Sequence, residues 1–214
     1  MEVSALKLLD IVDRVTRKIA PGPAPSFNEA HVIKTLELIN NCQSIGRIRL
    51  SRELGLGEGT TRTLLKHLKK ENLIQSSRMG VSLSDYGKKL FSDLSAKLSE
   101  GVEIPPSPLT FGTFNVAVLV RDSANAIGSG MEQRDTAIKS GASGATTLIF
   151  VDNKLSLPIR EENLSKTMPD LHDELINKLS PNENCVIIVG SGETKEIAEI
   201  GAKMAAIKLL KSIN

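Results

Sequence analysis

The side chains best suited to contacting nucleic acid lie between residues 44 and 92. Lys and Arg number ten in this segment against four Asp and Glu, although the whole chain of 214 residues has a formal net charge of only +2. Arg donates to phosphates and to the edge of guanine, and Thr offers both a hydroxyl and a methyl group. This local excess of basic residues therefore favours a DNA contact that the total charge does not reveal.

The basic residues follow the period of a helix. In the run LGLGEGTTRTLLKHLKK, Leu64, Leu65 and Leu68 are spaced to face inward, which leaves the polar side chains for the outer surface. We expect this helix to begin near Glu58. The predicted DNA-contacting residues are Arg49, Arg52, Thr60, Thr61, Arg62, Thr63, Lys66, Lys70 and Arg78.

The elements on either side must position that helix. Ile48, Leu50 and Leu54 predict the buried face of a short preceding helix, with a glycine turn at residues 55–57. Asn72 ends the second helix, because Asn tolerates the left-handed conformation. Strands at 74–76 and 81–83 then form a hairpin with Arg78 at its tip, and a closing helix runs from residue 84 to about residue 98.

This order of elements resembles winged helix-turn-helix transcription regulators of bacteria and archaea over roughly residues 28–98. The resemblance implies that Thr60, Arg62, Thr63 and Lys66 belong to the recognition helix and Arg78 to the wing. More broadly, the segments VLVRDSANAIGSGMEQRD and GATTLIFVDNKLSLP resemble the C-terminal part of archaeal winged-helix regulators, which implies a regulator architecture and names no ligand.

Two glycine-flanked turns in the second half of the chain predict a site for a small anionic ligand. A turn that leads from a strand into a helix exposes free amides at the positive end of the helix dipole. Ordinary tight connections would give the same pattern, and neither turn matches a P-loop or a Rossmann fingerprint. The predicted ligand-binding residues are Arg121, Gly128, Ser129, Gly130, Arg134, Gly190, Ser191 and Gly192.

Composition divides the chain into two expected domains. Pro105, Pro106 and Pro108 predict a linker, so that residues 1–104 form a winged-helix domain and residues 105–214 an effector-binding or dimerisation domain. The second domain alternates short apolar runs with amphipathic helices, and the overall class is α+β with a small mixed sheet. Its expected strands are 114–120, 145–151, 155–158 and 185–189, and its expected helices are 131–139, 169–179 and 193–210.

An amphipathic helix is expected at the N-terminus, over residues 2–19. Leu8, Val12, Val15 and Ile19 form its apolar stripe, and the prolines from Pro21 onward end it. The stripe can pack on its own domain or supply a dimer contact. Ser26 or Asn28 then caps a second helix that extends to about residue 40.

Other chemistries find little support in the residues. Cys42 and Cys185 lie far apart in apolar contexts, which is typical of reduced thiols and of an intracellular, cytoplasmic protein. The three histidines have no metal-ligand spacing, and no nucleophile motif or membrane-length apolar run occurs. We therefore expect no catalytic residues, no metal and no cofactor.

These observations predict a cytoplasmic transcription regulator that binds double-stranded DNA as a homodimer and responds to a small ligand through its second domain. A different interpretation is an enzyme acting on a nucleotide or phosphorylated metabolite, with the winged helix as an accessory. A third is an RNA-binding or chromatin-associated protein that uses the same basic face without sequence preference.

Overall fold

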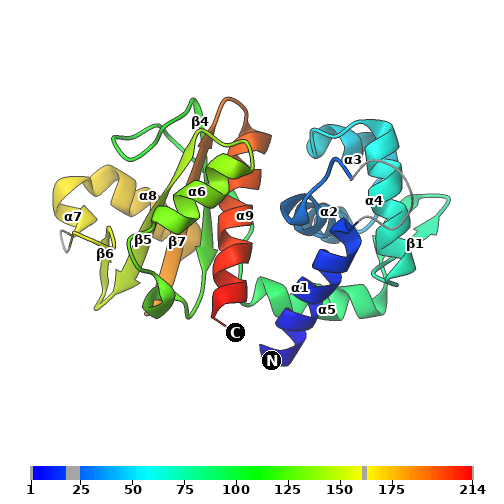
Figure 1. The fold of residues 1–214 in the computed structure, drawn as a ribbon, viewed down its shortest axis with the longest axis horizontal. Coiled ribbons are helices and arrows are strands. Elements are labelled where there is room, and N and C mark those ends of the chain that lie inside the picture. The colour runs from blue at the N-terminus through cyan, green and yellow to red at the C-terminus, as the bar shows by residue number, and fades with distance from the viewer. Residues whose placement is uncertain (1, 18–24, 161–162, 214) are drawn as a thin grey trace. The chain divides into compact units, whose positions relative to one another are not determined.

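The computed structural model of the chain describes residues 2–17, 25–160 and 163–213, with the backbone alone for residues 2–6. The chain divides into two compact units, Met1–Ser95 and Ala96–Asn214. Figure 1 shows a helical first unit with a small hairpin and a second unit built on a sheet. The α+β class is confirmed, and each unit is described by itself below.

Unit 1 is formed around two N-terminal helices, α1 (Glu2–Thr16) and α2 (Glu29–Cys42). Leu8, Val12 and Val15 are buried, and α1 packs against α2, α4 and α5 of the same unit. The apolar stripe of α1 therefore serves the core of its own unit. The predicted extension to Ile19 and the breaking prolines from Pro21 to Pro23 lie outside the described residues.

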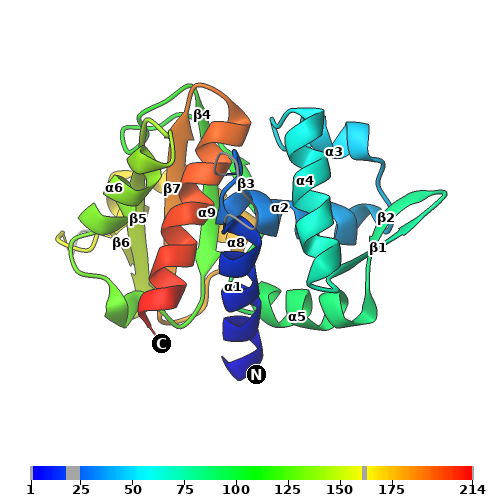
Figure 2. The same ribbon diagram turned by 45° about the vertical axis from the view of Figure 1, so that its right-hand side comes forward.

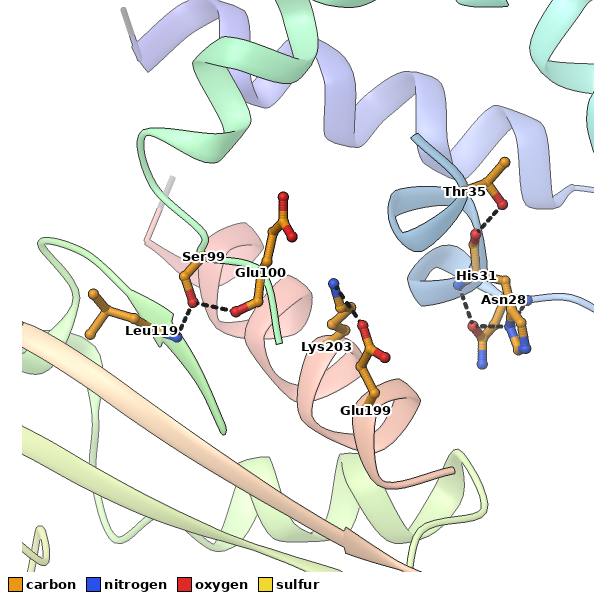
Figure 3. Close-up of polar contacts among 8 residues, drawn as sticks. All are labelled: Asn28, His31, Thr35, Ser99, Glu100, Leu119, Glu199 and Lys203. Atoms are coloured by element: carbon orange, nitrogen blue, oxygen red, sulfur yellow. Dashed lines mark hydrogen bonds and ion pairs between the residues drawn. The ribbon is translucent and has the colours of Figure 1, made fainter. Parts of the chain in front are cut away.

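The start of α2 is closed by its own side chains, as Figure 3 shows. Asn28 is the N-cap, and its Oδ1 accepts from the backbone N–H of His31 at 3.2 Å, while Nδ1 of His31 accepts from the backbone N–H of Asn28 at 3.2 Å. This reciprocal capping box satisfies two amides that the helix itself cannot pair. The predicted cap at Asn28 is confirmed.

Two helices follow in the arrangement of a helix-turn-helix: α3 (Arg47–Glu53) and α4 (Glu58–Lys70). Gly55 takes a φ of 64° in the turn between them, a conformation that favours glycine. Leu50 and Leu54 of the first helix and Leu64 and Leu68 of the second are buried. Asn72 then takes a φ of 58°, and this left-handed residue reverses the chain as predicted.

A hairpin follows, formed by β1 (Ile74–Ser77) and β2 (Gly80–Leu83) in antiparallel register. An isolated bridge joins Ile45 to Val81, so the segment before α3 lies along the hairpin as a third, minimal strand. The closing helix α5 (Asp85–Ser95) ends unit 1. Figure 2 shows the hairpin projecting from the helices. This is the order of elements expected of a winged helix-turn-helix.

Unit 2 contains, in the part that the structure describes, a five-stranded sheet of order β3-β4-β7-β5-β6. All of its pairings are antiparallel, so the predicted mixed sheet is corrected in this respect. The reason is that β7, the last strand of the chain, inserts between two earlier strands that run the same way. The bounds are β3 (Val102–Ile104), β4 (Phe114–Val120), β5 (Gly144–Val151), β6 (Lys154–Ser156) and β7 (Cys185–Gly192).

Helices cover both faces of the sheet (Figure 1). One face packs against α7 (Leu164–Thr167) and α8 (Pro169–Leu179), where Leu171 and Leu175 join Leu119 and Ile187 in one core. The other face carries α6 (Met131–Lys139) and α9 (Lys195–Ser212), which lie against each other near Gly201. A short 3-10 helix, η1 (Ala124–Ala126), follows β4.

The longest helix, α9, carries charge into the interior. Lys203 is fully buried, and its Nζ lies 3.2 Å from Oε1 of Glu199 one turn earlier (Figure 3). Ser99 links the start of unit 2 to the sheet. Its Oγ accepts from the backbone N–H of Leu119 at 2.8 Å and donates to the carbonyl oxygen of Glu100 at 2.8 Å. In α9, the pairing of Lys203 with Glu199 on adjacent turns offsets part of the free-energy cost of removing each charge from water.

The boundary between the units differs from the predicted one after residue 104. Val102–Ile104 pairs with β4 as an edge strand, so the second unit already begins at residue 96 and the prolines at 105–108 form a loop inside it. The strand is only three residues long, and the alternation of Val102, Glu103 and Ile104 is too short to predict a strand. The closing helix of unit 1 accordingly ends at Ser95, before the expected end near residue 98.

Candidate nucleic-acid interface

The outward face of α4 is a continuous polar stripe. Arg62, Lys66 and Lys70 are exposed at intervals of about one turn, with the exposed Thr63 next to Arg62, while Leu64 and Leu68 face the core. Three of these side chains are cationic, and Thr63 adds a hydroxyl that already donates to the carbonyl oxygen of Gly59 at 3.1 Å. A helix with this face could lie along a major groove.

The first turn of α4 is left open. Gly57 is the N-cap and makes no side-chain hydrogen bond to the helix. A Cβ placed on Gly57 or Gly59 would meet nothing within 4 Å, so both glycines border open space. Unpaired first-turn amides carry partial positive charge and can donate to a phosphate that comes close.

Ion pairs engage the acidic residues beside the stripe. Glu58 lies 3.9 Å from Arg47, Glu53 lies 3.8 Å from Arg49, and Glu71 is held at 2.9 Å by Arg14 of α1, measured between nitrogen and carboxylate oxygen. The hydrogen bond to Glu71 raises the pKa of the Arg14 guanidinium. The carboxylates nearest to α4 therefore contribute little uncompensated negative charge.

Other basic side chains remain available for a partner. Within the described residues, none of them forms an ion pair or a hydrogen bond through its side chain. Because exposed charges of one sign repel each other and attract phosphate, this group defines a basic surface. We call it the α3–α4–wing surface; it consists of Arg52, Arg62, Lys66, Lys69, Lys70 and Arg78.

Short hydrogen bonds hold the wing tip in place. Oγ of Ser44 donates to the carbonyl oxygen of Met79 at 3.1 Å, and Oγ of Ser77 accepts from the backbone N–H of Met79 at 3.1 Å. Gly80 takes a φ of 128°, and a Cβ there would lie 2.7 Å from the carbonyl oxygen of Ile45. The tip therefore requires glycine at this position, and it presents Arg78 to solvent.

The structure corrects the predicted exposure of two residues, Thr61 and Ile48. Thr61 is fully buried and its Oγ1 donates to the carbonyl oxygen of Gly57 at 3.1 Å, because residue 61 lies on the same inward stripe as Leu64 and Leu68. Ile48, predicted to be buried, is 54% exposed, since it lies about half a turn away from Leu50.

The remaining predicted positions fall on or near the surface. Arg49, Arg52, Arg62, Thr63, Lys66, Lys70 and Arg78 are exposed, and Thr60 is half-buried. His67 has a structural role, because its Nδ1 lies 2.8 Å from the carbonyl oxygen of Val15 and its ring meets Phe27 edge-on. Sequence reasoning omitted Lys69 and Gly59, although their spacing from Arg62 and Lys66 places both on the exposed side of the helix.

The predicted anion site in unit 2 is not formed by Gly190, Ser191 and Gly192. These residues belong to strand β7 and are buried. A Cβ on Gly190 would lie 2.2 Å from the carbonyl oxygen of Ala198, so the glycine lets α9 approach the sheet. Oγ of Ser191 donates to Oδ1 of Asn115 at 2.7 Å and accepts from the backbone N–H of Phe111 at 3.0 Å. Packing and internal hydrogen bonds thus explain the motif.

The other predicted ligand-binding residues do not converge on that segment. Arg121 follows Val120, which pairs with Val186, whereas Gly190 pairs with Val116, so Arg121 and Gly190 are separated by about 15 Å along the sheet. Gly128 and Ser129 are exposed, and Gly130 starts α6 with a φ of 79°. Arg134 lies 3.6 Å from the carboxylate of Asp135. The first turn is present, but its amides and the predicted arginines form no common site with Gly190.

A pocket of about 400 Å³ occurs elsewhere in unit 2. Its ionisable groups are the carboxylates of Asp170 and Glu174, which do not suit an anion. Among the described residues, no three His, Cys, Asp or Glu side chains gather as a metal site would require, and no helix is long and apolar enough to cross a membrane. The pocket is lined by Pro105, Pro106, Ser107, Pro108, Thr167, Met168, Pro169, Asp170, Leu171 and Glu174.

Comparison with known proteins finds one similar family model for a part of each unit and a similar solved structure. Residues 30–89 match the family model described as PH0730-like, N-terminal domain, and residues 111–209 match the model described as domain of unknown function (DUF4443). A solved structure titled hypothetical protein PH0730 from Pyrococcus horikoshii OT3 is similar, with 26% identity and a TM-score of 0.72 over 87% of this chain and 94% of that one. No curated protein matches significantly.

Proposed function

We propose that unit 1 binds double-stranded DNA, with α4 in the major groove and Arg78 of the wing on the backbone or in the minor groove. In this proposal the chain is a transcription regulator and not an enzyme, and it acts as a homodimer on two half-sites. The run LGLGEGTTRTLLKHLKKENLI resembles winged helix-turn-helix regulators. This resemblance suggests that the chain binds DNA and regulates transcription.

The observation that supports the proposal most directly is the contrast between paired and available charges. Glu53, Glu58 and Glu71 each lie beside an arginine, whereas the six basic residues of the α3–α4–wing surface have no such partner among the described residues. A face used for protein contact would gain from apolar or mixed side chains. A face with unopposed cations and an open helix start suits phosphates.

The first test removes two cations from the centre of this face. In the variant Arg62→Ala/Lys66→Ala, affinity for duplex DNA should fall at least about tenfold, and the slope of log affinity against log salt should become shallower by about two, because two phosphate or base contacts are lost. Fluorescence anisotropy in a salt series from about 50 to 200 mM measures both.

The matched control removes two exposed lysines from unit 2. In Lys154→Ala/Lys166→Ala the chain loses the same net charge, so a general electrostatic effect would weaken binding equally in both variants. We expect the control to bind as the unaltered chain does. Equal binding by all three proteins would refute the assigned face.

Duplex RNA of the same sequence separates the DNA proposal from RNA binding. The major groove of A-form RNA is too deep and narrow for a helix such as α4, so affinity for the RNA duplex should be lower at every salt concentration. Equal affinity for both duplexes would show that the face binds phosphate without using the groove.

A further inference from the structure

The outer face of α6 carries two large apolar side chains that nothing in the described structure covers. Met131 is 56% exposed and Ile138 is 46% exposed. They are seven residues apart and therefore lie on the same side of the helix, two turns from each other, while Gln133 and Ala137 face the sheet. Such a stripe is the pattern of a helix that packs against another helix.

Charged side chains accompany this stripe from one end of α6 to the other. Glu132 lies in the first turn and Lys139 in the last, and neither forms an ion pair within the described residues. Between them, Arg134 and Asp135 are both exposed and their charged groups are 3.6 Å apart. One end of the face is thus acidic, the other basic, and the centre holds one charge of each sign.

We propose that α6 is the contact between two copies of this chain, which pack antiparallel about a twofold axis near the middle of the helix. In this arrangement Met131 of each copy lies on Ile138 of the other, and the Arg134–Asp135 ion pair of each copy lies near the axis. The same register brings Glu132 within reach of Lys139 of the second copy, because the long lysine side chain spans an offset of about 3 Å along the axis.

Charge complementarity identifies the occupant and its direction. Parallel packing of two copies would place the two acidic ends at one level and the two basic ends at the other, whereas antiparallel packing brings Glu132 of one copy to Lys139 of the other at both ends. The helix dipole favours an acid in the first turn and a base in the last, and this accounts for the order of the charges. It does not account for two exposed apolar residues on the same face.

Neighbouring residues extend the surface at one end of the helix. Ile159 is 73% exposed, and the adjacent Pro158 lies close to Gly130, the residue that starts α6. A helix of nine residues is only about 13 Å long, so even with Ile159 the contact is small compared with that of a permanent dimer. The dimer should therefore form and dissociate with concentration.

Charge reversal on the full-length chain tests the proposed register. Sedimentation equilibrium over a concentration series gives the dimer dissociation constant of the unaltered protein. Glu132→Lys and Lys139→Glu should each raise it at least about tenfold, because each change places like charges together at two symmetric positions. The double variant Glu132→Lys/Lys139→Glu restores opposite charges and should return to within about threefold of the original value.

Mixing the two single variants gives a sharper result. A heterodimer of Glu132→Lys with Lys139→Glu places opposite charges at both ends, so an equimolar mixture should associate more tightly than either variant alone. Lys166→Glu, a reversal on α7, is the matched control and should leave the dissociation constant unchanged. Circular dichroism confirms that every variant is folded.

A monomeric chain at the highest concentration measured would overturn the proposal. Single reversals without effect, or a double variant as weak as the singles, would overturn it as well. A monomeric chain would also remove the homodimer from the proposed function, but these measurements use no DNA, so the assignment of α4 and the wing to DNA would stand. Unaltered DNA binding by Arg62→Ala/Lys66→Ala, which would refute the DNA face, leaves the α6 contact standing.

Discussion

Two Gly-X-Gly segments of this chain have opposite surroundings. Gly57-Glu58-Gly59 starts α4, where a Cβ on either glycine would meet nothing within 4 Å. Gly190-Ser191-Gly192 ends β7, where a Cβ on either glycine would strike α9. The same local sequence therefore leaves room for an outside partner in one unit and permits close internal packing in the other.

The middle residues of the two segments confirm the contrast. Glu58 is exposed and lies 3.9 Å from Arg47, whereas Ser191 is fully buried and hydrogen-bonded to Asn115 and to the backbone of Phe111. A buried hydroxyl whose proton and one lone pair are already engaged inside the unit is not accessible to a ligand. Glycine-rich turns thus suggest a binding site only where solvent reaches their amides.

The largest effect that could break this contrast is expected at Gly190. Gly190→Ala places a methyl group 2.2 Å from the carbonyl oxygen of Ala198, and backbone atoms cannot move aside cheaply. We expect the free energy of unfolding to fall by about 3 kcal/mol in urea denaturation. Gly128→Ala, where a Cβ meets nothing within 4 Å, is the control and should change it by less than about 0.5 kcal/mol.

The start of α2 differs from the uncapped start of α4. At α2, Asn28 and His31 accept hydrogen bonds from each other's backbone amides. Burial, and to a smaller extent the charge of Lys34, lowers the pKa of His31 to about 4 from 6.5. Between these values the unfolded chain binds a proton that the folded chain does not, so stability is lost as the pH falls from 6.5 to 4. Urea denaturation across this range should show a loss of roughly 2 kcal/mol.

His31→Gln separates the titration of His31 from that of other groups. Glutamine at this position can complete a capping box but does not titrate. The variant should keep most of the stability at neutral pH and lose the part of the pH dependence that comes from His31. An unchanged pH profile would mean that His31 is not the group responsible.

The smallest effect is expected for Gly59→Ala, which should make the protein slightly more stable but weaken its binding to DNA. Gly59→Ala should raise the free energy of unfolding by about 0.5 kcal/mol, since alanine favours the helix and the site has room. The added methyl should also weaken DNA binding if α4 approaches the duplex closely. A variant that is more stable and binds DNA as tightly would show that this start is not in contact.

Helices and turns were predicted well wherever local chemistry decides the structure. The bounds expected for α6, α8 and β4 agree with those observed, because each has a clear period and a break on both sides. Asp152 and Asn153 take φ values of 51° and 56° in the hairpin that joins β5 and β6, both of which were expected as strands. Asn28, Asn72 and Gly80 likewise act through their own backbone or side chains.

The features that sequence reasoning missed depend on distant residues. Gly190 is a strand glycine because of α9, which follows it, and Val102–Ile104 becomes a strand because β4 pairs with it. Thr61 differs from these two cases, because its spacing from Leu64 and Leu68 already places it on the inward stripe of α4. Neither α9, the partner of Gly190, nor β4, the partner of residues 102–104, can be identified as a partner from the residues next to these positions in the sequence. The basic surface was largely found, since exposed charge at helical spacing is a local signal.

The position of β7 has a consequence for the growing chain. It is the central strand of its sheet and pairs on both sides, yet it follows the other four strands of that sheet in the chain. Until residue 192 has emerged, β4 and β5 leave the ribosome with their inner edges unpaired, and open strand edges invite association with other chains. Unit 1 has all its elements by residue 95 and can fold well before then. A stalled or truncated product would therefore combine a folded N-terminal unit with an incomplete, aggregation-prone sheet.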